Sequence, residues 1–319
     1  MSPSRIGQSA LKAAKGSASG LPKAPKNTKI SPAPRRTSAP LPNRANAHLR
    51  NLSSEPQSRM SPRTMTILGV SALTISTYCG YLYASYRREV TQAQLIIVPE
   101  DVSDRYNRTA RTFDAGVELS EKLMRMGKKR RDLVQQARGD VLEVSCGTGR
   151  NLDYYNLQAQ CCRSVTFVDL SPEMVEIVQE KFAKLYPGFK KVEFRTQDAR
   201  EVPPPSDNRR YETDGCYYDT IVQTMGLCSM PDPAGALRHL GTITEPQHGR
   251  ILLLEHGRSH YDWLNRLLDN LAPAHADRHG CWWNRDIGQI VQDSGLEIIE
   301  EQRWHFGTTW RYVLKPGPS

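Results

Sequence analysis

Short apolar runs alternate with helical segments through the C-terminal half of the chain, and this alternation limits the available folds more than any other feature. Helices are predicted between the runs, one behind an N-cap formed by Ser171 and Pro172 and another capped by Asn284. Repeated strand–helix units favour a mostly parallel sheet with a ligand crevice at the carboxyl ends of its strands. The predicted strands are 141–144, 165–168, 192–194, 219–223, 251–255, 296–299 and 310–314.

A loop with glycines at 147 and 149 follows the first strand. Without a Cβ, Gly147 and Gly149 let the backbone approach a ligand, and an expected helix start behind them offers N–H groups to an anion. Asp169 ends the second strand, where a carboxylate suits the two hydroxyls of a ribose. A nicotinamide dinucleotide site is the weaker alternative, because Leu152 stands where the G-x-G-x-x-G pattern needs a third glycine.

In this order, the motifs resemble those of the class I S-adenosylmethionine-dependent methyltransferases. Residues 141–149 are similar to the family's first motif, in which the acidic Glu143 precedes a small-x-Gly-x-Gly loop. Val168-Asp169 is similar to the second motif, and 197–199 to the third. Ser145 departs from the pattern, since a glycine is usual there. The resemblance implies a Rossmann-like α/β fold with a seven-stranded, mostly parallel sheet.

The resemblance also implies S-adenosylmethionine as the cofactor and suggests its contacts. Gly147 and Gly149 would border the methionine part, and Asp169 would hold the ribose. Asp198 would lie beside the adenine amino group, and Glu143 would order the loop from below. The predicted cofactor-binding set is completed by Ser145, Leu170, Gln197, Ala199 and Gln223.

Three later segments, 223–229, 254–258 and 279–281, resemble a narrower, membrane-associated group that includes alkyl thiol methyltransferases. With its N-terminal features, the chain resembles fungal mitochondrial inner-membrane methyltransferase-like proteins over about residues 64–319. A small apolar acceptor is therefore expected: a thiol, a quinone-like ring or a lipid. The alternative is a catalytically silent factor that keeps the fold and assists assembly of inner-membrane or respiratory-complex proteins.

Methyl transfer is an in-line displacement in which positioning supplies most of the acceleration. His256, just after the fifth strand, is the predicted base; a structural histidine bonded to a backbone carbonyl is the alternative. A later segment is expected to form a lid over the acceptor pocket, or else to be core or membrane-facing surface; it holds His275, His279, Trp282 and Trp283. By resemblance, a helix carrying Tyr106 and Phe113 would close over the cofactor.

Residues 64–86 carry no charge and lie between Arg63 and the pair Arg87-Arg88. At about 1.5 Å per residue, such a helix crosses the roughly 30 Å of bilayer hydrocarbon. Small side chains recur every four residues and offer a ridge for another membrane helix, at Ala72, Ser76, Gly80 and Ala84. We predict one membrane anchor, a linker over 87–104 and a methyltransferase domain over 105–319. A buried helix of a soluble protein is the alternative for 64–86.

Residues 1–63 are rich in Ser, Pro, Lys and Arg and hold a single acid, Glu55, which is typical of a mitochondrial presequence. A disordered basic tail is the alternative. The formal net charge is +9, but the basic excess lies in this segment, so a nucleic-acid partner is not expected. Import order and the positive N-terminus favour the inner membrane with the domain in the intermembrane space; the matrix is the alternative.

The seven cysteines form no C-x-x-C pair, which argues against a disulfide framework and a zinc site, so no metal is predicted. They are expected to be reduced apolar residues. The basic run 128–131 is interpreted either as a contact for anionic lipid headgroups or as a solvated helix end.

Overall fold

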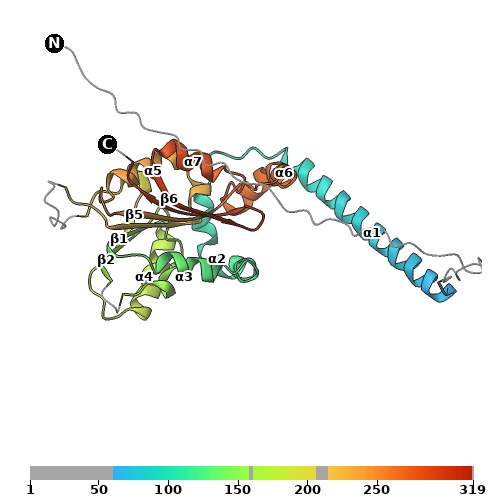
Figure 1. Ribbon diagram of the computed structural model, residues 1–319, viewed down its shortest axis with the longest axis horizontal. Coiled ribbons are helices and arrows are strands. Elements are labelled where there is room, and N and C mark those ends of the chain that lie inside the picture. The colour runs from blue at the N-terminus through green and yellow to red at the C-terminus, as the bar shows by residue number, and fades with distance from the viewer. Residues whose placement is uncertain (1–59, 158–160, 206–214, 318–319) are drawn as a thin grey trace, which may run out of the picture. The chain divides into compact units, whose positions relative to one another are not determined.

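The computed structural model describes residues 60–157, 161–205 and 215–317, so nearly all of the predicted presequence lies outside the described residues. The chain divides into two compact units, Met1–Met65 and Thr66–Ser319. In the first unit only residues 60–65 are described, and they hold the start of helix α1. The second unit contains the sheet and all the other elements (Figure 1).

One seven-stranded sheet forms the centre of the domain, with the order β3-β2-β1-β4-β5-β7-β6. The first five strands run parallel, whereas β7 is antiparallel to both β5 and β6. The predicted mostly parallel, seven-stranded fold is therefore confirmed. The strand bounds are Gly139–Val144 (β1), Cys162–Asp169 (β2), Val192–Thr196 (β3), Thr220–Thr224 (β4), Arg250–His256 (β5), Glu297–Trp304 (β6) and Thr309–Lys315 (β7).

Helices cover both faces of the sheet, with α5 and α7 on one side and α3 and α4 on the other (Figure 1). Successive side chains of a strand point to opposite faces, so Val141 belongs to one apolar cluster and Leu142 to the other. Burial on both faces explains the continuous apolar run that predicts β1. The helices are α2 (Asp104–Leu123), α3 (Met126–Val134), α4 (Pro172–Leu185), α5 (Pro233–Thr242), α6 (Asp262–His279) and α7 (Ile287–Ser294).

The N-cap predicted for α4 is confirmed, because the Ser171 side chain accepts a hydrogen bond from the Met174 N–H and Pro172 opens the helix. The cap predicted for α7 is wrong. Asp286 caps that helix, and Asn284 instead donates a side-chain hydrogen bond to Asp269. The helix expected behind the glycine loop is also wrong, since only a 3₁₀ turn forms there, η1 (Leu152–Tyr154).

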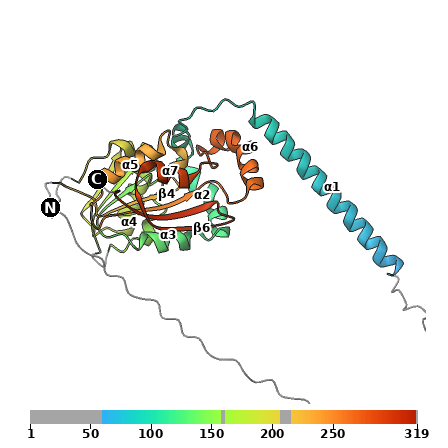
Figure 2. The same ribbon diagram turned by 45° about the horizontal axis from the view of Figure 1, so that its top comes forward.

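Helix α1 (Pro62–Ala93) has 32 residues and contains the predicted span 64–86 (Figure 2). Its most apolar 18-residue stretch has a mean hydropathy of 1.3, and none of that stretch is buried. A helix of this length rises about 48 Å, which exceeds the roughly 30 Å of bilayer hydrocarbon. By length and composition, α1 is therefore able to cross a membrane.

Candidate functional site

A cavity lies at the carboxyl ends of β1, β2 and β4, beside the point where the strand order reverses from β1 to β4. Ligands of open α/β sheets bind at such a switch point. Helix α2 contributes Tyr106 and Phe113 to the wall, and their rings meet edge to face at 6.0 Å. Of the predicted cofactor set, the structure brings to this cavity Ser145, Gly147, Asp169, Leu170, Gln197, Asp198 and Ala199.

Asp169 links the end of β2 to the glycine loop. Its Oδ2 accepts the Gly147 N–H at 2.8 Å, and its Oδ1 accepts the Ser171 N–H at 3.0 Å. Burial raises the pKa of this carboxyl, while the backbone N–H groups act in the opposite direction. Each oxygen keeps a lone pair, so the carboxylate can accept further hydrogen bonds from a diol inside the cavity.

The two glycines are required for different reasons. Gly147 has a φ of +53°, and an added Cβ would meet nothing within 4 Å, so only its backbone conformation favours glycine. Gly149 has a φ of +80°, and a Cβ there would lie 2.8 Å from side-chain carbons of Leu152 and Val178. This glycine lets the loop pack on the domain, and it does not line the cavity.

Ser145, the departure from the family pattern, takes a φ of +52°, a conformation that favours glycine. Its side chain has room because residue 226 lacks a Cβ. A Cβ built on Gly226 would lie 2.5 Å from the Ser145 Cβ and 2.6 Å from its Oγ. The serine in the first motif and the glycine after β4 are therefore sterically coupled.

Asp198 opens a 3₁₀ turn, η2 (Ala199–Glu201), and accepts the Arg200 N–H at 2.8 Å. Its carboxylate also pairs with the Arg200 guanidinium at 2.7 Å, which lowers the pKa of Asp198. The side chain is thereby held at the cavity wall as an anion. Such an anion can accept a hydrogen bond from an amino group.

Glu143 lies beneath the loop and outside the cavity lining. It accepts hydrogen bonds from Asn151 Nδ2 at 3.0 Å and from the Tyr155 hydroxyl at 2.5 Å. Burial raises its pKa to about 7, against the opposing effect of these two donors. These hydrogen bonds tie Glu143 to the turn that follows the glycines.

Two other predicted residues do not line the cavity. Gln223 is fully buried in β4, and its amide atoms have no hydrogen-bond partner among the described residues. The ring of His256, the predicted base, lies 2.8 Å from Cys281 Sγ through its Nε2 atom. The segment interpreted as a lid also lies outside the lining; there His275 stacks on Trp283 at 3.9 Å between ring centroids.

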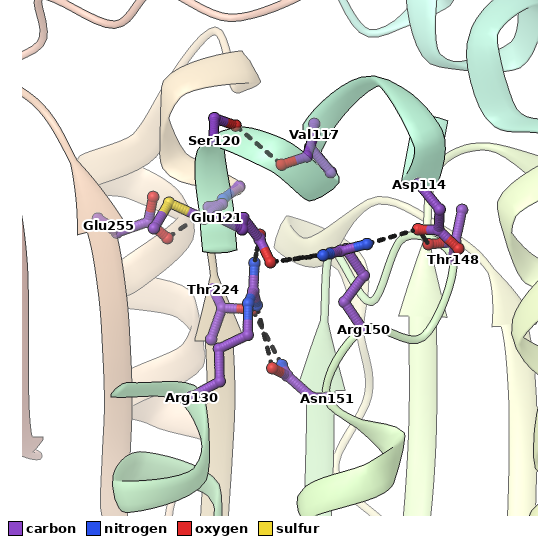
Figure 3. Close-up of polar contacts among 12 residues, drawn as sticks. Asp114, Val117, Ser120, Glu121, Arg130, Thr148, Arg150, Asn151, Thr224 and Glu255 are labelled. Carbon is purple, nitrogen blue, oxygen red and sulfur yellow. Dashed lines mark hydrogen bonds and ion pairs between the residues drawn. The ribbon is translucent and has the colours of Figure 1, made fainter. Parts of the chain in front are cut away.

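A network of charged side chains joins α2, α3 and the glycine loop, and sequence reasoning missed it (Figure 3). Glu121 stands between two arginines, at 2.8 Å from Arg130 and 2.6 Å from Arg150. Arg150 also pairs with Asp114, which accepts the Thr148 hydroxyl at 2.6 Å. Both arginines line the cavity, so the network fixes one wall of it.

Arg130 corrects the interpretation of the basic run 128–131. Its side chain is 5% exposed, so it is neither a lipid contact nor a solvated helix end. Nη1 donates to Asn151 Oδ1 at 3.0 Å and to Thr224 Oγ1 at 2.7 Å, which ties α3 to the loop and to β4. The available signal was the spacing of buried residues along α3, where Met126, Arg130 and Leu133 share one helix face.

The cavity fits the predicted cofactor in chemical terms. Carboxylates at Asp169 and Asp198 suit hydroxyl and amino donors, and Met174, Phe113 and Met225 supply apolar surface for a flat ring system.

A comparison with protein families matches residues 109–301 to a family described as a methyltransferase domain. The chain belongs to this family. The predicted S-adenosylmethionine-dependent methyltransferase domain and its cofactor are therefore confirmed.

The chain is 42% identical over 226 residues to the yeast (Saccharomyces cerevisiae) "Methyltransferase OMS1, mitochondrial", covering 69% of this chain and 47% of that protein. It is 28% identical over 191 residues to the human "Thiol S-methyltransferase TMT1B", covering 56% and 72% of the two chains. The solved magnesium protoporphyrin IX methyltransferase of Synechocystis is 17% identical, with a TM-score of 0.46, covering 69% of this chain and 98% of its own. The chain thus spans about half the length of the yeast relative.

Proposed function

We propose that the chain is a membrane-anchored mitochondrial methyltransferase that transfers a methyl group from S-adenosylmethionine to a small apolar acceptor. The observation that carries the proposal is the Asp169 carboxylate in the cavity, bonded to the Gly147 N–H at 2.8 Å. This contact fixes the glycine loop and the ribose-binding group relative to each other before any ligand enters. Preorganisation of this kind reduces the cost of binding.

The acidic and glycine residues at the loop and the cavity have different roles in the proposal. Asp169 holds the ribose hydroxyls, and Asp198 with its neighbours 197 and 199 borders the adenine. Gly147 borders the methionine part, and Gly149 keeps the loop packed on the domain. When bound, S-adenosylmethionine supplies a methyl group activated by a positive sulfonium. The rings of Tyr106 and Phe113 face the same cavity, where aromatic faces attract a cation.

In the transfer, the carbon–sulfur bond of the donor breaks as the bond from carbon to the acceptor forms. The chain's contribution is to align the two partners and to exclude water. A thiol is the favoured acceptor, because no histidine lines the cavity in the part of the chain that the structure describes. A thiol is far more acidic than an alcohol, with a pKa of about 8.5 in cysteine, so it needs a weaker base to form its nucleophilic anion. For His256 to act as the base, a proton relay would have to connect its ring to the cavity.

The proposed location rests on three supports. The yeast relative is named as mitochondrial, residues 1–63 have the composition of a presequence, and α1 has the length and hydropathy of a span. An anchor concentrates the domain at the bilayer, where apolar acceptors partition. We extend the proposal to the inner membrane, with the domain in the intermembrane space.

Full-length protein in detergent micelles with methyl-labelled S-adenosylmethionine tests this function. Three acceptors are offered separately: an aliphatic thiol, a hydroquinone and an aminophospholipid. Label is expected in the thiol, and its transfer is expected to be lost in Asp169→Ala but kept in Asp132→Ala, which changes an exposed aspartate of α3. Transfer to the hydroquinone or the lipid alone would refute the thiol assignment.

The second candidate is a catalytically silent factor in assembly of inner-membrane complexes. It is favoured by one observation: the small-residue ridge of α1 is exposed at Ala72, Ser76, Gly80 and Ala84. Binding of S-adenosylmethionine without transfer to any acceptor would support this candidate over the enzyme. Crosslinking from Gly80→Cys to another membrane protein would then identify the partner.

A further inference from the structure

Three side chains that commonly bind metals converge from distant parts of the chain. Cys228 lies in the turn η3 (Leu227–Ser229) after β4, His256 ends β5, and Cys281 follows α6. Their sulfur and ring-nitrogen atoms all lie within 4.8 Å of one another. The His256 Nε2 and Cys281 Sγ atoms are 2.8 Å apart, which is within hydrogen-bond distance.

We propose that Cys228, His256 and Cys281 bind one zinc ion through two thiolates and an imidazole. In a tetrahedral site with Zn–S bonds of about 2.3 Å and Zn–N bonds of about 2.0 Å, neighbouring ligand atoms stand about 3.5 to 3.8 Å apart. The His256 Nε2 and Cys281 Sγ atoms, at 2.8 Å, are closer than this, and no pair of ligand atoms is more than 4.8 Å apart. Side-chain shifts of about an ångström would therefore complete the site. Soft thiolates with imidazole are a typical zinc ligand set, whereas calcium and magnesium prefer oxygen ligands.

The backbone holds the cluster in place without an ion. Cys228 and Cys281 are 1% and 4% exposed, so solvent does not compete for their sulfurs. The Cys228 carbonyl accepts the Trp282 N–H at 3.0 Å and Arg285 Nε at 3.3 Å, which ties the two cysteine segments together. A site assembled in advance loses little conformational freedom when the metal binds.

A buried carboxyl with one unpartnered oxygen lies next to the cluster in the chain. Glu255 is fully buried; its Oε1 accepts the Gly226 N–H at 3.2 Å, while Oε2 has no hydrogen-bond partner among the residues described. Arg285 is the neighbouring cation, and it donates to the main-chain carbonyls of residues 228 and 230. The unpartnered Oε2 is a buried polar atom that a cation bound nearby would stabilise.

The site borders the cofactor cavity. Ser229 lines the cavity, and its Oγ lies 3.6 Å from Cys228 Sγ and 2.9 Å from the Tyr106 hydroxyl. An ion on Cys228 would therefore fix the wall on which Tyr106 rests. Three protein ligands leave one tetrahedral position for water or an external thiolate, as in catalytic zinc sites. This inference goes beyond the proposed function and does not depend on the methyl acceptor.

The test uses the full chain in detergent micelles, purified without chelators and without a polyhistidine tag. Elemental analysis is expected to give about one zinc per chain, and binding is expected to release the two thiol protons. Replacement by cobalt is expected to give the intense visible bands of tetrahedral Co²⁺ and thiolate charge-transfer absorption. Because these spectra come from the unmodified chain, they do not depend on whether a variant folds.

Variants then assign the ligands. Cys228→Ser and Cys281→Ser are each expected to weaken zinc binding roughly a hundredfold or more, since each removes one of three bonds from a site of this class. Cys162→Ser is the control, because Cys162 is equally buried in β2 and contacts the Ala137 carbonyl. It is expected to leave zinc binding unchanged.

Three results would overturn the proposal: a folded chain that takes up no zinc on titration, unchanged zinc affinity in both ligand variants, or a Cys228–Cys281 disulfide in anaerobically purified protein. Titration of S-adenosylmethionine into the same samples tests the methyltransferase proposal separately. If the chain binds the cofactor but no zinc, only the zinc-site proposal is refuted.

Discussion

Replacing Glu143 with glutamine is expected to change how the stability of the domain depends on pH. Glu143 is buried in β1, where burial raises its pKa from 4.5 to about 7. A carboxyl with a raised folded pKa stabilises the native state below its unfolded pKa, and this contribution is lost as pH rises through the folded value. The stabilising contribution of Glu143 is therefore lost between about pH 4.5 and about pH 7.

The size of the effect follows from the shift. A difference of roughly 2.5 pKa units, at 1.36 kcal/mol per unit, corresponds to about 3 kcal/mol. Glutamine carries no charge at any pH and keeps an oxygen that can accept one of the two hydrogen bonds. The free energy of unfolding of Glu143→Gln, relative to that of the unmodified chain, should therefore increase by about 3 kcal/mol from the acidic to the alkaline end of this pH range.

Urea unfolding of both proteins in the same detergent, at several pH values from 5 to about 8, measures this difference. Groups common to both chains, including Glu255, cancel in the comparison. Glu180→Gln, at an exposed position of α4, serves as the control. Its free energy of unfolding should differ from that of the unmodified chain by the same amount at every pH. A flat difference for Glu143→Gln as well, within about 0.5 kcal/mol, would refute the reasoning that burial holds this carboxyl protonated.

Gly226→Ala should weaken S-adenosylmethionine binding more than tenfold, because the new Cβ lies 2.5 Å from the Ser145 Cβ. Adding Ser145→Gly should restore most of the affinity in calorimetric titration, and failure of this rescue would contradict the steric coupling. Arg130→Ala should destabilise the domain by about 3 kcal/mol or more in urea unfolding, because it removes the hydrogen bonds that the buried guanidinium donates to Asn151, Thr224 and Glu121. Lys128→Ala, at an exposed position of the same helix, should change stability by less than about 0.5 kcal/mol, and an effect equal to that of Arg130→Ala would contradict the structural role of Arg130.

The sequence was sufficient for the sheet and the cofactor loop, because their signals are local. Strand β1 is buried on both faces, so its apolar run has no polar alternation, and Ser171 with Pro172 marks a helix start within two residues. The helix expected after Gly149 did not form. The chain instead turns at Leu152, and Asn151 and Tyr155 donate hydrogen bonds to Glu143. These contacts with β1 cannot be predicted from the residues of the turn alone.

Sites built from distant segments escaped sequence reasoning. Arg130 lies in a run of four basic residues, and only the rotation of α3 separates the buried arginine from its exposed neighbours. Cys228, His256 and Cys281 lack the close spacing that marks a zinc motif, because the turn after β4, the end of β5 and the segment after α6 bring them together. For the same reason the sequence did not reveal that His256 faces Cys281 and lies outside the cavity lining.

The central claim is that the cavity above Asp169 binds S-adenosylmethionine. Calorimetric titration of the cofactor into the full chain, Asp169→Ala and Asp132→Ala tests it most directly. Two charge-assisted hydrogen bonds, at about 1.5 kcal/mol or more each, predict at least a roughly hundredfold loss in Asp169→Ala and no change in the control. Equal affinity in all three proteins, or no binding by a folded, unmodified chain, would contradict the account.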